Sequence, residues 1–223
     1  MNLTDADRAR VSAAVSAAEA ASSGEIVTIM AARSDDYGDV ALAWSALVAL
    51  TALVALSLAP DFYIGLYDRL TGGWAREWSP ARLFGVAALV AAIKFAGTWL
   101  ILLWRPLRLA LTPAPIRHNR VHARALAAFR IGAERRTTGR TGILIYLSLA
   151  EHRAEIIADE AIASKVSADV WGEALAAMLA EIRRGQMADG LVAAVSKVGT
   201  VLAAHFPRAA DDTNELPDRL IEV

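Results

Sequence analysis

Two long runs in the first half of the chain contain almost no ionisable side chain, and they restrict the possible folds more than any other feature. Residues 40–59 read VALAWSALVALTALVALSLA, and residues 83–104 read LFGVAALVAAIKFAGTWLILLW, with Lys94 as their one charge. About 20 such residues in a helix cross a hydrocarbon core of roughly 30 Å. A chain of 223 residues is too short to enclose two helices that are apolar all round. We therefore expect a transmembrane hairpin at residues 40–104.

The connection between the two runs, residues 60–82, is rich in aromatic side chains. Tyrosine and tryptophan are enriched where a membrane protein meets the lipid headgroups. In a helix over residues 61–70, several apolar and aromatic side chains share one face, which is typical of an interfacial segment. The sequence thus predicts an interfacial loop. The side chains of this face are Phe62, Tyr63, Leu66, Tyr67 and Leu70, and Trp74 and Trp78 follow them.

Lys94 is the unusual residue of the second run because it lies about 15 Å from either end at helical rise. Insertion of a lysine at that depth costs roughly 2.5–3.5 kcal/mol, so we expect a polar partner. In an antiparallel hairpin Thr51 reaches a similar depth and is the candidate acceptor. Lys94 is then either a functional charge, which couples to a ligand or another subunit, or a locally hydrated lysine.

Charge and composition restrict the compartment and the partners. The net charge is only −1, which gives no global basic field for nucleic acid, and the absence of cysteine excludes disulfides and thiolate sites. The N-terminus does not have the pattern of a signal peptide. Six arginines flank the two runs on the outside, against three in the loop, which favours both termini in the cytoplasm. The flanking set is Arg33, Arg105, Arg108, Arg117, Arg120 and Arg124, and the loop set is Arg69, Arg76 and Arg82.

The segments outside the runs alternate between helical and strand patterns. We expect helices at residues 5–21 and 116–134, and strands at residues 25–31, 143–149 and 154–158. Two further helices with apolar stripes are expected at residues 168–184 and 189–206. The tail from residue 208 is expected to be extended or irregular. One helix and one strand before the membrane cannot bury each other, so strand 25–31 needs partners from the second half. We expect it to pair in parallel with strand 143–149.

These segments resemble the TPM domain family, which includes thylakoid lumen acid phosphatase, photosystem II repair proteins and many bacterial membrane proteins. The resemblance covers residues 1–38 and 115–223, and our chain is similar to a bacterial branch with a hairpin inserted in the domain. It lies in LTDADRARV and SSGEIV near the N-terminus, in TGILIYLSLAEHRAEIIADEAI at residues 141–162, in Val166, Trp171, Met178, Gly185, Gly190 and Gly199, in HFP at residues 205–207, and in NELPDRLI at residues 214–221.

The resemblance implies a three-layer α/β domain with a small mixed sheet, interrupted by the transmembrane hairpin. It also implies the bacterial inner membrane as the location. Some relatives bind a divalent metal and cleave phosphate esters, so Ca²⁺ or Mg²⁺ is the candidate cofactor. A bound metal would polarise the phosphoryl oxygens and activate a water molecule.

Two clusters of polar residues are candidate sites. If strand 154–158 is antiparallel to its neighbour, Asp159 and Glu160 emerge at the same sheet edge as Glu25, and three carboxylates suit a hard cation. The alternative is that Asp159 caps the following helix and Glu25 faces solvent. The opposite edge, where ligands bind in open α/β sheets, is the second candidate site. Its residues are Asp35, Asp36, Glu151 and His152.

The helix at residues 116–134 has a strongly basic face opposite Val121, Ala125 and Phe129. That face is expected to lie against anionic headgroups. His118 and His122 have a spacing that can bind a metal, but the neighbouring arginines repel a cation and the sequence offers no third ligand.

Two functions follow from these observations. The first is a membrane-anchored interaction or assembly module whose cytoplasmic domain binds a protein partner or a second copy of the chain, with a divalent cation as a candidate ligand. The second is a metal-dependent phosphatase. The first requires fewer assumptions, because the sequence contains no phosphate-binding glycine loop, nucleophile elbow or HExxH motif.

Overall fold

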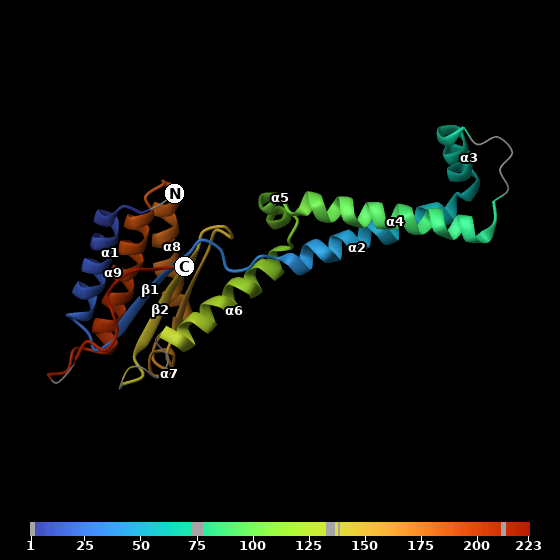
Figure 1. Cartoon of the computed structure of the whole chain (residues 1–223). Helices are drawn as coiled ribbons and strands as arrows, with labels where there is room; N and C mark the ends of the chain where they lie inside the picture. The colour runs from blue at the N-terminus through green and yellow to red at the C-terminus, as the bar shows by residue number, and fades with distance from the viewer. Residues whose placement is uncertain (1–2, 73–77, 133–136, 138, 211–212) are drawn as a thin grey trace. The chain divides into compact units, whose positions relative to one another are not determined.

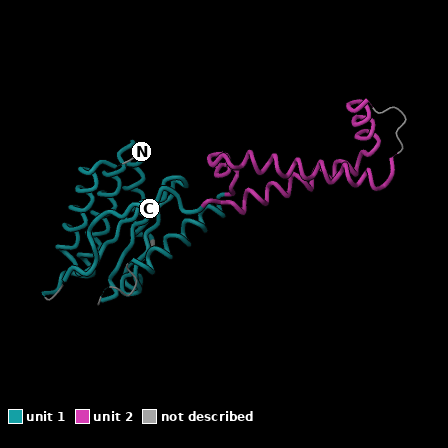
Figure 2. Tube along the Cα trace, in the orientation of Figure 1, with its two compact units in different colours: residues 1–35, 114–223 teal, residues 36–113 magenta. Residues whose placement is uncertain are grey.

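The chain forms two compact units in the computed structural model, which describes residues 3–72, 78–132, 137, 139–210 and 213–223. Unit 1 contains residues 1–35 and 114–223, and unit 2 contains residues 36–113 (Figure 2). Residues 73–77, which include Trp74 and Arg76 of the expected interfacial loop, lie outside the described residues.

Unit 1 is built on a four-stranded mixed sheet with the order β3-β2-β1-β4. Strand β1 (Glu25–Ala31) pairs in parallel with β2 (Gly142–Ser148) over seven residues, from Glu25 opposite Gly142 to Ala31 opposite Ser148. Strand β3 (Arg153–Ala158) is antiparallel to β2. The parallel pairing that the sequence predicts is thus confirmed. It joins two stretches of chain separated by more than 100 residues.

Helices cover both faces of this sheet, so the predicted three-layer α/β fold is confirmed (Figure 1). Side chains alternate along β1, with Ile26 and Met30 in one core and Val27 and Ile29 in the other. Helices α1 (Asp5–Glu19), α8 (Ala168–Arg183) and α9 (Met187–His205) pack on the first face. Helix α6 (Ala114–Gly132) covers the second face with its predicted stripe.

Local signals explain where several of these helices begin. Thr4 and Asp7 form a reciprocal capping box at the start of α1, which satisfies backbone donors that the first turn leaves free. Asp159 caps the short helix α7 (Glu160–Ala163) by accepting a hydrogen bond from the Glu160 backbone. Each cap places an acidic residue at the positive end of a helix dipole.

The C-terminal tail was expected to be extended or irregular, and it ends in an extended segment. Ile221–Glu222 forms strand β4, parallel to β1, and Leu216 and Leu220 are buried. The pairing with β1 was not predicted, because two residues are too few to produce a strand pattern. Their pairing is stabilised by distant partners, such as the ion pair between Arg8 and Glu222 at 2.6 Å.

Unit 2 contains α2 (Gly38–Leu58), α3 (Pro60–Thr71), α4 (Pro80–Leu102) and α5 (Arg105–Ala110). Helix α3 forms the first half of the expected interfacial loop. Pro60 lies in its first turn, and Gly72, with φ of 63°, ends it. Phe62, Leu66 and Leu70 are exposed, as expected for a face that meets lipid.

Among the described residues, three helices are long and apolar enough to cross a membrane: α2, α4 and α9. Helix α9 is different from the other two because its apolar stripe is buried in unit 1, where it contacts α1 and α8. Most side chains of α2 and α4 are not covered by protein. The two helices that the sequence predicts to span the membrane are therefore the two candidate spans whose side chains are mostly left uncovered.

Candidate functional site

The predicted cation residues lie at the edge of the sheet where β1 begins. Gly142 of β2 pairs with Glu25, and its carbonyl accepts a hydrogen bond from the Asp159 backbone at 2.8 Å. The three carboxylates have partners in the protein, and Asp159 and Glu160 share one of them, Arg140, which lies 3.7 Å from Asp159. Glu25 accepts a hydrogen bond from the Leu216 backbone at 3.0 Å, Asp159 caps α7, and Glu160 forms an ion pair with Arg140 at 2.8 Å.

These contacts do not form a cation cage. In the described part of the chain, no group of three or more His, Asp or Glu side chains is arranged to hold a metal ion. Asp159 is buried, and its Oδ2 atom has no hydrogen-bond partner there. A Ca²⁺ or Mg²⁺ site at Asp159, Glu160 and Glu25 stays a prediction.

A cavity of about 150 Å³ lies next to this edge, between the end of α1 and the C-terminal segment. Glu19, Glu25 and Asp218 line it together with Asn214 and Arg208. Glu19 is buried, and its Oε1 accepts a hydrogen bond from the Ile26 backbone at 2.7 Å, while no donor among the described residues reaches its Oε2. Burial and the nearby Glu25 and Asp218 carboxylates raise the pKa of Glu19 to about 8, against the opposing effect of the Ile26 hydrogen bond.

The protonation of Glu19 explains how this buried acid tolerates the half-buried Asp218 beside it. A protonated Glu19 can donate a hydrogen bond to Asp218. Although burial raises the pKa of Asp218, hydrogen bonds from Ser16, Asn214 and Glu19 hold it below its usual value. This carboxyl pair therefore carries one negative charge and attaches the C-terminal segment to α1.

The opposite edge of the sheet contains a network of hydroxyl groups around a buried carboxylate. The Ser34 hydroxyl lies 2.8 Å from that of Ser148 and 3.1 Å from that of Tyr146. The Glu151 carboxylate accepts hydrogen bonds from the Ser34 backbone, at 3.1 and 3.3 Å, and from the Ser148 hydroxyl. The network holds the loop after β1 against the turn between β2 and β3.

Only part of this network could be found from the sequence. Of the four residues predicted there, Glu151 is at its centre, while Asp35 lies 3.5 Å from Arg120. His152 is exposed with φ of 50°, and Asp36 belongs to unit 2. The three hydroxyl residues were missed because serine and tyrosine near strand ends are common, and only the parallel register brings them together.

Replacing Glu151 by Gln is expected to destabilise unit 1 by roughly 1–2 kcal/mol, because charge-assisted hydrogen bonds to Ser34 and Ser148 are weakened. Chemical denaturation of the full chain in detergent measures this loss. Glu173→Gln on the exposed side of α8 is the matched control and should leave stability unchanged. Equal stability of both variants would contradict a structural role for Glu151.

Helix α6 and strand β3 together place the two histidines of the sequence pattern beside a carboxylate. Glu155 lies 3.7 Å from His118 and 3.4 Å from His122, and Arg153 lies 3.2 Å from His118. The sequence showed no such third group because Glu155 comes from another element. The guanidinium group beside His118 leaves this cluster better suited to anions than to a metal ion.

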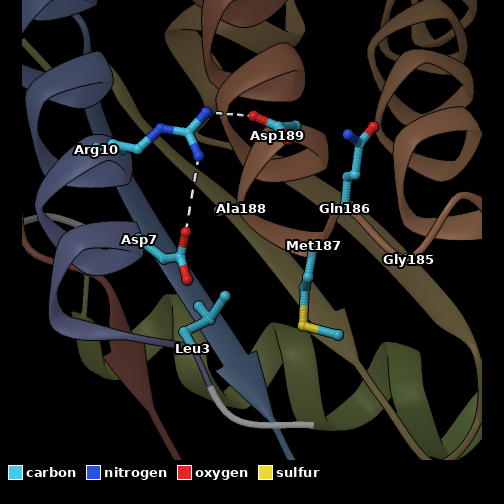
Figure 3. Close-up of a pocket in the computed structure, with 8 residues that line it drawn as sticks. All are labelled: Leu3, Asp7, Arg10, Gly185, Gln186, Met187, Ala188 and Asp189. Atoms are coloured by element: carbon cyan, nitrogen blue, oxygen red, sulfur yellow. Dashed lines mark hydrogen bonds and ion pairs between the residues drawn. The ribbon is translucent and has the colours of Figure 1, made fainter.

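A second cavity, of about 250 Å³, lies between the start of α1 and the start of α9 (Figure 3). Arg10 points into it and forms ion pairs with Asp189 and, at 3.6 Å, with Asp7. Leu3 and Met187 add an apolar wall. Because two carboxylates surround one guanidinium group, the cavity has no excess positive charge for an anionic substrate.

In unit 2, Lys94 and Thr51 are both exposed. The Thr51 hydroxyl donates a hydrogen bond to the Leu47 carbonyl of its own helix at 2.8 Å. The predicted contact, in which the Thr51 oxygen accepts from Lys94, is not among the hydrogen bonds of the described residues. The role of Lys94 stays a prediction.

Comparisons with known proteins agree with the fold. The family model of the TPM domain matches residues 118–201, which confirms the predicted resemblance over that part of the chain. The NMR structure of BA42 protein from the psychrophilic bacterium Bizionia argentinensis is similar, with a TM-score of 0.57 and 19% sequence identity, covering 100% of this chain and 97% of that chain. At this identity the likeness supports a shared fold. No curated protein matches the chain.

Proposed function

We propose that this chain, which carries a TPM domain at residues 118–201, is a membrane-anchored interaction module of the bacterial inner membrane. Helices α2 and α4 span the bilayer, and unit 1 binds a protein partner or a second copy of the chain in the cytoplasm. The observation that carries the proposal is the seven-residue parallel pairing of β1 with β2, because the two candidate spans lie between these strands along the chain.

This connectivity supports a hairpin topology. Strand β1 ends at Ala31 and α2 begins at Gly38, while α4 ends at Leu102 and α6 begins at Ala114. Both ends of the hairpin therefore return to one folded unit, which requires an even number of crossings. The excess of arginine outside the two runs favours the cytoplasmic side for that unit.

The chemistry of unit 1 supports binding better than catalysis. Glu151 is buried and uses its carboxylate to hold Ser34 and Ser148, so these hydroxyls are engaged in structure. Glu25 and Asp159 are buried and bonded to backbone groups. A nucleophile beside a general base would need a side chain that faces a substrate.

Two measurements on the full chain separate the module from the phosphatase. The first is hydrolysis of a chromogenic phosphate ester by detergent-purified protein with Mg²⁺, Ca²⁺ or EDTA, for which we expect no metal-dependent turnover. The second is chemical cross-linking in native membranes, for which we expect a discrete adduct larger than the 23.8 kDa chain.

The Gly199→Ala variant, which we expect to disrupt the packing of unit 1 but not the hairpin, is the control for cross-linking. Its adduct should disappear while membrane insertion continues. Turnover that needs a metal and is lost in Asp159→Ala, with folding intact, would contradict the module and favour the phosphatase. An adduct that persists in Gly199→Ala would assign the interaction to the hairpin.

A further inference from the structure

Helix α6 and strand β3 present a continuous basic surface, which we call the basic face. Helix α6 packs Val121, Ala125 and Phe129 against the sheet, while His118, Arg120, His122 and Arg124 are exposed and Arg117 is half-buried. Strand β3 adds an arginine beside the helix. The basic face consists of Arg117, His118, Arg120, His122 and Arg124 of α6 and Arg153 of β3.

Positive charge is in excess on this surface. The carboxylates in ion-pair contact with it include Asp35, 3.5 Å from Arg120, and Glu155, which lies beside both histidines. Arg124 interacts with the buried Tyr146. Helix α6 itself contains no Asp or Glu, so only carboxylates from other elements can balance its arginines. Guanidinium groups bind phosphate oxygens in a fork geometry, so the unbalanced charge suits phosphate groups.

The position of the basic face along the chain indicates where the phosphate groups come from. Its helical residues lie between positions 117 and 124, in the first part of α6, whereas the rest of α6 carries only Arg130. Arg117 follows the end of α4 at Leu102 by 15 residues, and the short helix α5 between them carries Arg105 and Arg108. A span in the bilayer thus holds the basic face close to the headgroups.

We infer that the basic face binds the phosphate headgroups of anionic phospholipids in the bilayer that α2 and α4 cross. This inference rests on the proposed membrane anchoring and adds the lipid class to it. The net charge of −1 gives the whole chain no general attraction for polyanions, so the basic face is a local positive surface. Each arginine near an anionic surface adds roughly fivefold to binding, and the interaction weakens with salt.

The absence of cysteine from the chain allows a direct test with one attached probe. Ala123, exposed between Arg120 and Arg124, is replaced by Cys and labelled with a fluorophore, and the full chain is placed in nanodiscs that contain a headgroup-attached quencher. We expect at least twofold stronger quenching in discs with phosphatidylglycerol than in discs with phosphatidylcholine alone. The difference should disappear in 0.5 M NaCl. A probe at Ala180→Cys on α8 should not respond.

Two matched variants assign the effect to the basic face. The first triple variant should abolish the lipid dependence of the quenching; it combines Arg117→Gln, Arg120→Gln and Arg124→Gln. The second should preserve it; it combines Arg183→Gln, Arg184→Gln and Arg219→Gln, which are exposed elsewhere in unit 1. Circular dichroism checks that both variants fold. Equal quenching in the two lipids would overturn the inference, and so would an equal loss of the lipid dependence in both variants. If soluble glycerol phosphate at millimolar concentration abolishes the stronger quenching, the basic face binds a free anion instead of the lipid. Because the protein must be inserted for the measurement, failure of this test leaves the proposed anchoring intact.

Discussion

Replacing Gly199 by Ala is expected to destabilise unit 1 by about 3 kcal/mol, because α1 and α9 are packed too closely for a methyl group. A Cβ atom at Gly199 would lie 2.5 Å from the Cβ of Ala18 and 3.2 Å from its Cα, so backbone as well as side chain must move. The expected loss exceeds the gain of about 1 kcal/mol from a better helix former. Hydrogen exchange of the β1 and β2 amides in the full chain measures this change.

Two further variants distinguish steric overlap from other effects of the substitution. Ala18→Gly removes the methyl group that the new Cβ of Gly199→Ala would contact. The double variant should therefore recover about half of the protection from hydrogen exchange that Gly199→Ala loses. Gly172→Ala in α8, where a Cβ would meet nothing within 4 Å, should leave unit 1 unchanged or slightly more stable. Destabilisation by Gly172→Ala equal to that by Gly199→Ala would contradict close packing of α1 and α9.

We expect the natural protein to become less stable as the pH rises from about 4.5 to 8, because of Glu19. Replacing Glu19 by Gln is expected to remove most of this pH dependence. The pKa of Glu19 rises from its ordinary 4.5 to about 8 on folding, so the folded state holds a proton that the unfolded state releases. The resulting stabilisation is complete below pH 4.5 and is lost as the pH rises through 8. Three to four pKa units correspond to roughly 4–5 kcal/mol.

Glutamine can keep the contacts of a protonated Glu19. Its carbonyl oxygen can accept the hydrogen bond from the Ile26 backbone, and its amide can donate to Asp218. At pH 8 the Glu19→Gln variant should therefore melt at a higher temperature than the natural protein, and at pH 5 at a similar one. Glu173→Gln is the control for a changed surface charge. A melting temperature with the same pH dependence in Glu19→Gln and the natural protein would show that Glu19 is ionised in the folded state.

Elements with a long repeat of apolar side chains could be predicted from the sequence. Strand β1 has the predicted bounds, and α1 begins at Asp5 as predicted. The parallel pairing of β1 with β2 could be inferred because a lone strand needs partners and a hairpin of apolar helices separates it from them. These features depend on local patterns or on burial, both of which are visible in a single sequence.

The candidate site could be predicted only in part, because its contacts depend on register and not on pattern. Ser34 and Ser148 are 114 positions apart and meet through the alignment of β1 with β2. Glu19 belongs to an otherwise ordinary amphipathic helix, and its raised pKa arises from burial and from Glu25 and Asp218 near its end. Strand β4 has two residues, fewer than any periodic signal requires.

The central claim is that one folded unit is made from the stretches on either side of a membrane hairpin. Its most direct test is a reporter that is active on one side of the membrane only, fused in turn to the N-terminus, to the C-terminus and at Gly72 after α3. We predict that both termini report the cytoplasm and that the fusion at Gly72 reports the opposite side. Termini on opposite sides of the membrane would contradict the pairing of β1 with β2 and, with it, the hairpin topology.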